Sequence, residues 1–316
     1  MNTLLLSHSP HHTRLAWAKA VGAKIKILPF SGLIRFTKKH PWASFFYPLI
    51  SFFYSLFLWG KIDILLVEGG SALYVAAFLT WRRPALKLIY LDCDLFFYKL
   101  KYLHPLTRFA ISQIDAAISD SEQNKEHLLK HINAPAQVCP PFPKEVFPSN
   151  IFRKNYALFV GRLEPDKNIE RIINFCLQCP HIEKTIIIGD GMLKAELQKK
   201  YPAVVFTGQQ NDPSPYYHEC KFLIHLPDAD PHPSTTMEAA LAGCFPIISK
   251  GTGTAYLFDE LFVVEDPEDF AKINEKISFI LKNEPTAREL LKTSTEKFPS
   301  KETCISNFIH AFEKLS

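Results

Sequence analysis

The sequence lacks the features that would place it in several large classes of protein. Its net charge of +4 is too small to indicate a nucleic-acid partner, although it favours anionic partners such as a diphosphate or an anionic lipid surface. The first residues have no basic start and no cleavage pattern of a secretory signal, so we expect a cytoplasmic protein. No short internal repeat is visible.

The seven cysteines form no disulfide framework, because their number is odd and their spacing is scattered. Cys176 and Cys179 have the CxxC spacing of some metal and redox sites, but no second pair and no suitably spaced histidines accompany them. The pair also falls in a run with helical periodicity, from Ile169 to Leu177. We therefore interpret both residues as packed thiols and expect no metal site there.

Apolar runs alternate with longer helical patterns along the whole chain. In the first half these runs cover residues 3–7, 24–29, 62–67, 87–91 and 116–119, and in the second half 156–160, 185–188, 203–206, 222–226, 245–248 and 261–264. Most are nearly continuous in Val, Ile, Leu and Phe, which is typical of parallel strands buried on both faces. For 316 residues, the pattern predicts two doubly wound α/β domains joined by the proline-rich stretch at 140–148.

The stretch from Trp42 to Gly60 contains no charged residue and is rich in Phe, Tyr and Trp. Its length meets the criterion for a transmembrane helix, but a strand-like run on each side argues against a span. Terminal Trp, internal serines and flanking lysines are typical of an interfacial segment. Peripheral contact with the inner face of the membrane and a buried helix of the first domain both remain open.

A predicted strand ends in Gly161, and Arg162 follows at once, with Lys167 five positions later. Glycine at a strand end lets a ligand approach the backbone, while Arg offers a planar fork of donors and Lys a point charge. These groups suit a diphosphate at the carboxyl ends of parallel strands, where open α/β sheets bind ligands. The alternative is a surface loop with two solvated cations.

Two carboxylates, Asp230 and Glu238, lie eight positions apart, the first in a loop and the second on an Ala-rich helical pattern. Ser234 and Thr235 open that pattern and can cap the helix or donate to an anion. Carboxylates placed in this way can accept hydrogen bonds from sugar and ribose hydroxyls. The alternative is a turn aspartate and a solvated glutamate on the helix surface.

Together these elements resemble the retaining group-one glycosyltransferases of the GT-B fold, over residues 156–280. The resemblance rests on the order and spacing of Gly161-Arg162-x4-Lys167-Asn168, Gly189-Asp190-Gly191, Gly208, Asp230-x7-Glu238 and Gly251-Thr-Gly253. It implies two Rossmann-like domains that face each other across a cleft. We expect an acceptor domain at residues 1–146, a donor domain at 147–303, and a C-terminal helix at 304–316 that packs back on the acceptor domain.

The resemblance also implies roles for the matched residues. Arg162 and Lys167 would hold the donor diphosphate and stabilise the leaving group, and Asp230 would lie near the transferred sugar. In other transferases a metal ion stabilises the leaving group. Here the fixed cations would do so, and we therefore expect neither a metal nor another cofactor. Gly208 and Gln209 would lie near the base, and Glu238 would bind the ribose. The other residues expected at the nucleotide-sugar site are Gly161, Gly189, Ser234 and Thr235.

The sequence departs from the family pattern in both halves. The first carboxylate is usually Glu, and here it is the shorter Asp230, with Pro231 and Pro233 in place of glycines. The loop after the first strand has histidines (His8, His11 and His12) and no glycine. A histidine usually follows the fourth strand, where this chain has Asp92 and Asp94. We take Asp94 as a candidate to orient the acceptor hydroxyl, with Asp92 and Glu68 as similar candidates.

The sequence therefore predicts a retaining transferase that moves a hexose-type sugar from a UDP- or GDP-linked donor to an acceptor hydroxyl. The acceptor would be a sugar or a lipid-linked molecule in the synthesis of glycolipid, cell-surface polysaccharide or another glycoconjugate. The alternative is a nucleotide-sugar-binding protein that has lost catalysis, which the Asp230 and proline departures would suit.

Overall fold

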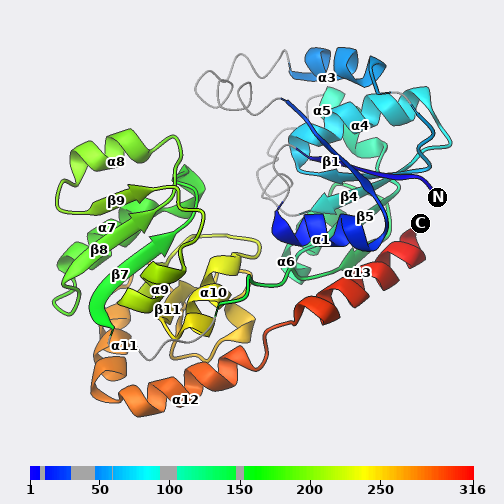
Figure 1. Cartoon of the computed structure of the whole chain (residues 1–316). Helices are drawn as coiled ribbons and strands as arrows, with labels where there is room; N and C mark the ends of the chain where they lie inside the picture. The colour runs from blue at the N-terminus through cyan, green and yellow to red at the C-terminus, as the bar shows by residue number, and fades with distance from the viewer. Residues whose placement is uncertain (8–10, 30–46, 59, 93–104, 147–152) are drawn as a thin grey trace. The chain divides into compact units, whose positions relative to one another are not determined.

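A computed structural model describes residues 1–7, 11–29, 47–58, 60–92, 105–146 and 153–316. The chain divides into two compact units (Figure 1). The N-terminal unit comprises Met1–Pro141 together with Ser300–Ser316, and the C-terminal unit comprises Phe142–Pro299. Each unit contains one parallel six-stranded sheet with helices on both faces, as the continuous apolar runs predict.

The sheet of the N-terminal unit has the order β2-β1-β3-β4-β5-β6. Its strands are β1 (Thr3–Ser7), β2 (Lys24–Ile27), β3 (Ile64–Glu68), β4 (Lys87–Asp92), β5 (Ala116–Ser119) and β6 (Ala136–Val138). Its helices are α1 (His12–Ala20), α3 (Tyr47–Leu56), α4 (Gly70–Arg82), α5 (Pro105–Ser112), α6 (Glu122–Leu129) and α13 (Lys301–Leu315). The three-residue β6 has no apolar run of its own, so the sequence did not predict it.

Alternate residues of these strands enter two separate cores. Leu6 and Val67 pack with α4, α5 and α6 on one face of the sheet, whereas Leu5 and Leu66 pack with α1 and α13 on the other. Successive side chains of a strand point to opposite faces, so a strand covered on both faces must be apolar at every position. The helix α13 contributes Phe308, whose ring stacks on Trp17 with centroids 4.5 Å apart.

The sheet of the C-terminal unit has the order β12-β11-β10-β7-β8-β9. Its strands are β7 (Lys154–Val160), β8 (Lys184–Ile188), β9 (Val205–Gly208), β10 (Cys220–His225), β11 (Phe245–Ser249) and β12 (Val263–Val264). Its helices are η2 (Pro165–Lys167), α7 (Ile169–Gln178), α8 (Lys194–Lys200), α9 (Ser214–Glu219), α10 (Ser234–Ala242), η3 (Ala255–Leu257), α11 (Phe270–Lys282) and α12 (Glu284–Thr295).

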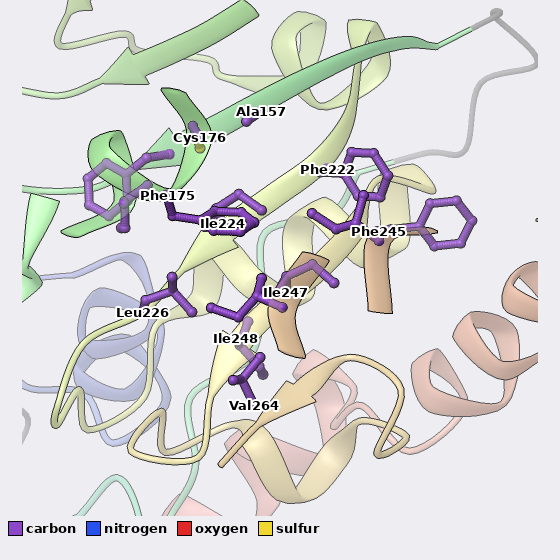
Figure 2. Packing of buried hydrophobic residues seen from close by; sticks show 14 of the residues in the cluster. Ala157, Phe175, Cys176, Phe222, Ile224, Leu226, Phe245, Ile247, Ile248 and Val264 are labelled. Atoms are coloured by element: carbon purple, nitrogen blue, oxygen red, sulfur yellow. The ribbon is translucent and has the colours of Figure 1, made fainter. Parts of the chain in front are cut away.

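The larger core of this unit lies between the sheet and α7, α11 and α12. Figure 2 shows Phe222 and Ile224 of β10 and Ile247 of β11 in this cluster, together with Phe175 and Cys176 of α7. Cys176 and Cys179 are both buried in it. Burial raises the pKa of the Cys176 thiol to about 12, so this thiol is protonated at neutral pH.

Among the helices that the structure describes, none has both the length and the apolar character needed to cross a bilayer. The aromatic stretch is described in part: α3 begins at Tyr47, while residues 42–46 and 59 lie outside the described residues.

Candidate functional site

The loops that carry the predicted donor residues leave the carboxyl ends of neighbouring strands. Gly161 follows β7, Gly189 follows β8 and Asp230 lies in the loop after β10, and β10, β7 and β8 are adjacent in the sheet. Because all the strands are parallel, these loops emerge at the same edge of the sheet. This edge is where open α/β sheets bind ligands.

Lys167 and Asp230 meet at this edge. The Lys167 ammonium donates to Asp230 Oδ2 at 2.5 Å, and His225 Nε2 lies 2.9 Å from the same oxygen. All three side chains are buried. Burial by itself raises the pKa of Asp230, but the charge of Lys167 and the hydrogen bond with His225 outweigh it and hold this pKa well below its usual range. Asp230 is therefore a buried, ionised carboxylate.

The position of Lys167 depends on an unusual backbone turn. Lys167 ends η2, and Asn168 then takes a left-handed conformation with φ 49° before α7 begins. The Asn168 side-chain amide donates to Asp228 Oδ2 at 2.9 Å, and Arg171 donates to Asp228 Oδ1 at 2.8 Å. These bonds tie the loop after β7 to the loop after β10. Asn is among the residues that tolerate this conformation best.

The Asp230 loop is also tied to the loop after β11. The Asp230 amide donates to Gly251 O at 3.0 Å, and the Gly253 amide donates to Asp230 O at 2.7 Å. A Cβ atom at Gly253 would overlap the carbonyl oxygen of Pro231. The chain therefore needs glycine at 253 because two backbones approach closely there.

Glu238 lies on α10 and is buried, so it is not a solvated charge on the helix surface. Tyr217 Oη donates to Glu238 Oε2 at 3.1 Å, and Ser234 Oγ donates to Oε1 at 3.0 Å. The backbone amide of Lys144 donates to Oε1 at 3.4 Å. Pro233 is the N-cap residue of α10 and supplies no side-chain cap. The Glu238 carboxylate is therefore oriented from three directions.

The remaining predicted donor residues lie nearer the surface. Arg162 is exposed, and its side chain makes no hydrogen bond or ion pair with another described residue. Gln209 is exposed, and Gly208 and Thr235 are half-buried. Gly189 takes φ 142°, and a Cβ atom there would overlap Gly161 O. The structure thus brings Lys167 and Asp230 into contact and leaves Arg162 accessible at the same edge.

In the N-terminal unit, Asp94 and His8 lie outside the described residues. Asp92 is buried at the end of β4 and accepts a hydrogen bond from Ser119 Oγ at 2.8 Å. Glu68 ends β3 and accepts from Ser7 Oγ at 2.6 Å. The buried Arg14 donates to Asp120 and lies 3.9 Å from Glu68. Polar groups therefore gather at the carboxyl edge of this sheet as well.

Sequence reasoning missed several residues that position these side chains. Tyr217 lies on a separate helix, 21 positions before Glu238, and His225 ends the strand before the Asp230 loop. Arg14 reads as an ordinary helix cation. One signal could have pointed to such residues. Glu238 lies among alanines in the sequence, and a carboxylate in a buried helix needs a hydrogen-bond partner. Among the described residues, no His, Cys, Asp and Glu side chains form a group that could hold a metal ion.

Comparison with known proteins identifies the C-terminal unit. The family "Glycosyl transferases group 1" matches residues 142–297. A GDP-mannose-dependent alpha-mannosyltransferase of Mycobacterium tuberculosis is 30% identical over 97 residues, which are 30% of this chain and 25% of the relative. The aligned region thus spans a quarter of that relative's length.

Solved structures match along almost the whole chain. Anabaena HepE in complex with UDP-glucose is 16% identical, with a TM-score of 0.74 over 99% of this chain and 100% of the other. OtsA in its apo form is 11% identical, with a TM-score of 0.72 over 100% of this chain and 99% of the other. These similarities and the two parallel sheets confirm the GT-B fold. The C-terminal unit therefore carries the domain of the group 1 glycosyl transferases, matched over residues 142–297.

Proposed function

We propose that this protein is a glycosyltransferase that uses a nucleotide-sugar donor bound at the carboxyl edge of the C-terminal sheet. The observation that carries the proposal is the buried Lys167–Asp230 pair beside the exposed Arg162. A fixed ammonium and an accessible guanidinium at one strand edge suit the two phosphates of a nucleoside diphosphate. The family membership of these residues supports the same role.

The reaction needs stabilisation of the negative charge that develops as the nucleoside diphosphate leaves. Lys167 and Arg162 would supply it, because preorganised cations that face the leaving oxygen lower the barrier. The backbone amides of Ser234 and Thr235, at the start of α10, would add donors to the same phosphates. With these groups in place we propose a reaction that needs no metal ion.

Glu238 would bind the ribose of the donor. Its two oxygens already accept from Tyr217, Ser234 and the Lys144 amide. An ionised carboxylate offers about four acceptor sites, so the ribose hydroxyls can still donate to it. Gly208 and Gln209 would lie near the base, and Gly161 and Gly189 would let the donor approach the backbone.

We further propose that the anomeric configuration is retained, by attack on the face that the leaving phosphate occupies, with that phosphate accepting the proton of the acceptor hydroxyl. The donor would carry a hexose on UDP or GDP. One relative is named for GDP-mannose and one solved relative binds UDP-glucose, so both nucleotides belong in the test. The acceptor would be a sugar or a lipid-linked molecule of glycoconjugate synthesis, bound by the N-terminal unit, where Asp94, Asp92 and Glu68 are candidates to orient its hydroxyl.

A second candidate function is nucleotide-sugar binding without catalysis. It is favoured by one observation: Asp230 Oδ2 already has contacts with both Lys167 and His225, which suits a carboxylate that holds Lys167 in place rather than one that meets the sugar. Donor binding without transfer to any of a wide set of acceptors would support this candidate.

Thermal melting in the presence of UDP, GDP, ADP and their common sugars tests the donor site. A ligand that binds only the folded state raises the melting temperature. We expect one nucleotide family to do so, and Arg162→Ala to reduce the shift without changing the stability of the free protein, because Arg162 is exposed. Lys282→Ala, an exposed cation on α11, is the matched control. No shift with any nucleotide at saturating concentration would contradict the proposal.

A further inference from the structure

Several residues of the helix α3 show the reverse of the burial expected of a surface helix, although Ile50 and Tyr54 pack against the core. Ser51 and Ser55 are fully buried, whereas Leu49 and Phe53 are each 53% exposed and Phe57, just beyond the helix, is 74% exposed. In water, burial of the phenylalanines would be favoured and the serines would be left outside. The reversal indicates that the outer face of α3 meets an apolar surrounding.

The buried serines have a clear packing role. α3 lies against α4 on the outer side of its unit (Figure 1), and small residues let two helices approach closely. Phe52 of α3 meets Phe78 of α4 edge-on, with ring centroids 5.3 Å apart. The α3–α4 contact is therefore complete without the exposed residues, which remain available to a partner.

The exposed apolar residues form one continuous stripe. Leu49, Phe53 and Phe57 follow at intervals of four, so they lie on the same side of the helix. Trp81, 59% exposed, is the next-to-last residue of α4. Its neighbour Arg82 donates to Ser55 O at 3.4 Å, so this end of α4 lies against the end of α3. We call Leu49, Phe53, Phe57 and Trp81 the α3 face.

Three cations lie close to the α3 face. α3 has no charged residue, and Arg82 and Arg83 lie at its C-terminal end, where Arg83 donates to Leu58 O at 3.1 Å and to Gly60 O at 3.0 Å. Lys61 follows and is exposed. A guanidinium has five donors, so both arginines retain donors for an external anion.

We propose that the α3 face is a docking surface for an anionic lipid bilayer. Phe53, Phe57 and Trp81 would enter the boundary between headgroups and acyl chains, and Arg82, Arg83 and Lys61 would pair with lipid phosphates. An apolar stripe bordered by cations is the arrangement by which proteins lie on a membrane without crossing it. The inference is independent of the donor site, since it rests on the other unit of the chain.

Flotation of the full chain with phospholipid vesicles, in the absence of any nucleotide, tests the proposal. We expect the protein to float with vesicles that contain phosphatidylglycerol, to float much less with pure phosphatidylcholine, and to be released by salt. The double variant Phe53→Ser/Phe57→Ser should weaken vesicle binding about tenfold or more, since two anchors are lost.

Phe279→Ser is the matched control, because Phe279 is also an exposed phenylalanine but lies on α11 of the C-terminal unit. It should leave vesicle binding unchanged. Equal binding by the two variants, or no binding of the unaltered protein to either vesicle, would overturn the proposal. So would a stable dimer in sedimentation that the double variant dissociates, since the α3 face would then cover a second copy. Nucleotide-induced melting shifts, measured on the same variants, report the donor site separately.

Discussion

Lys167 and Asp230 are 63 positions apart in sequence and form a buried ion pair at the edge of the C-terminal sheet, with Nζ and Oδ2 2.5 Å apart. The pair joins the loop after β7 to the loop after β10, and a third loop, after β11, holds Asp230 through its backbone. The contact therefore joins the two sequence motifs from which the donor site was predicted.

The ion pair should make the C-terminal unit sensitive to acid. The pKa of Asp230 is lower in the folded protein than in the unfolded chain. Its contribution to stability is then fully present above the unfolded value, about 3.9, and is lost as the pH falls toward the folded value. We expect denaturant midpoints to drop steeply below about pH 4.

Asp230→Asn should reduce the fall of the denaturant midpoint below about pH 4, the part of the pH profile that we call the acid limb. At neutral pH it should also lower the free energy of unfolding by about 3–5 kcal/mol, because Lys167 would be buried without its anion. Glu265→Gln removes an exposed carboxylate that pairs with Lys250 and is the control that should keep the wild-type slope. An acid limb of the same slope in Asp230→Asn and in the unaltered protein would show that another group governs it.

Tyr217→Phe should loosen the orientation of Glu238 without touching the donor. Loss of a hydrogen bond to a buried carboxylate should cost about 1.5–3 kcal/mol of stability, and the KM for the donor should rise more than kcat falls. Tyr201→Phe is the matched control, since it removes a Tyr–Glu hydrogen bond of 2.7 Å to Glu170, outside the site. An unchanged KM alongside the stability loss would mean that Ser234 and the Lys144 amide suffice to hold Glu238.

The buried cysteine thiols should not react with thiol reagents in the native protein. Burial raises the pKa of Cys139, Cys176 and Cys220 to about 12 and that of Cys304 to about 11. The thiolate is the reactive form, so a thiol reagent at pH 8 should label these residues only after denaturation. Of the seven cysteines, Cys93 lies outside the described residues, and we expect at most one rapid labelling event per native chain. Two or more would contradict the burial.

Phe308→Ala should destabilise the N-terminal unit although the residue follows the C-terminal unit in sequence. Phe308 is fully buried and stacks on Trp17, so its truncation should cost about 3–5 kcal/mol and change the tryptophan fluorescence. Phe279→Ala, at an exposed position, should change stability by less than about 0.5 kcal/mol. Differential scanning calorimetry of both variants would decide whether α13 is part of that core.

The fold could be predicted well from the sequence because its strands are buried on both faces. Runs such as 3–7 and 116–119 coincide with β1 and β5. A short continuous apolar run between helical patterns is typical of a buried strand. β6 was not predicted, because its three residues are half-buried at the edge of the sheet and do not form an apolar run. The pairing of Lys167 with Asp230 could not be predicted, because it depends on which strands are adjacent in the sheet. The spacing of residues within a motif does not determine the order of the strands.

The site was predicted as a set of residue types and not as a network. Glycine and charge spacing pointed to Arg162, Lys167 and Glu238, because glycines and charged side chains near strand ends are residue types that a phosphate or sugar site needs. Tyr217 contacts Glu238 and His225 contacts Asp230, but they lie in a short helix and a strand that the spacing of the motifs does not single out. Burial of a polar group requires a partner, but the sequence alone does not say from which element the partner comes.

The division of the chain into units has a consequence for its biosynthesis. The C-terminal unit is one continuous segment, while the N-terminal unit takes α13 from beyond it. Domains usually fold as units in the order of their synthesis. Here the N-terminal unit is translated first but cannot be completed until the C-terminal unit has been made. Until then it lacks α13, and part of one face of its sheet stays uncovered. A chaperone that shields apolar surface would bind the first half of the nascent chain. The C-terminal unit, although its synthesis begins later, would be completed before the N-terminal unit.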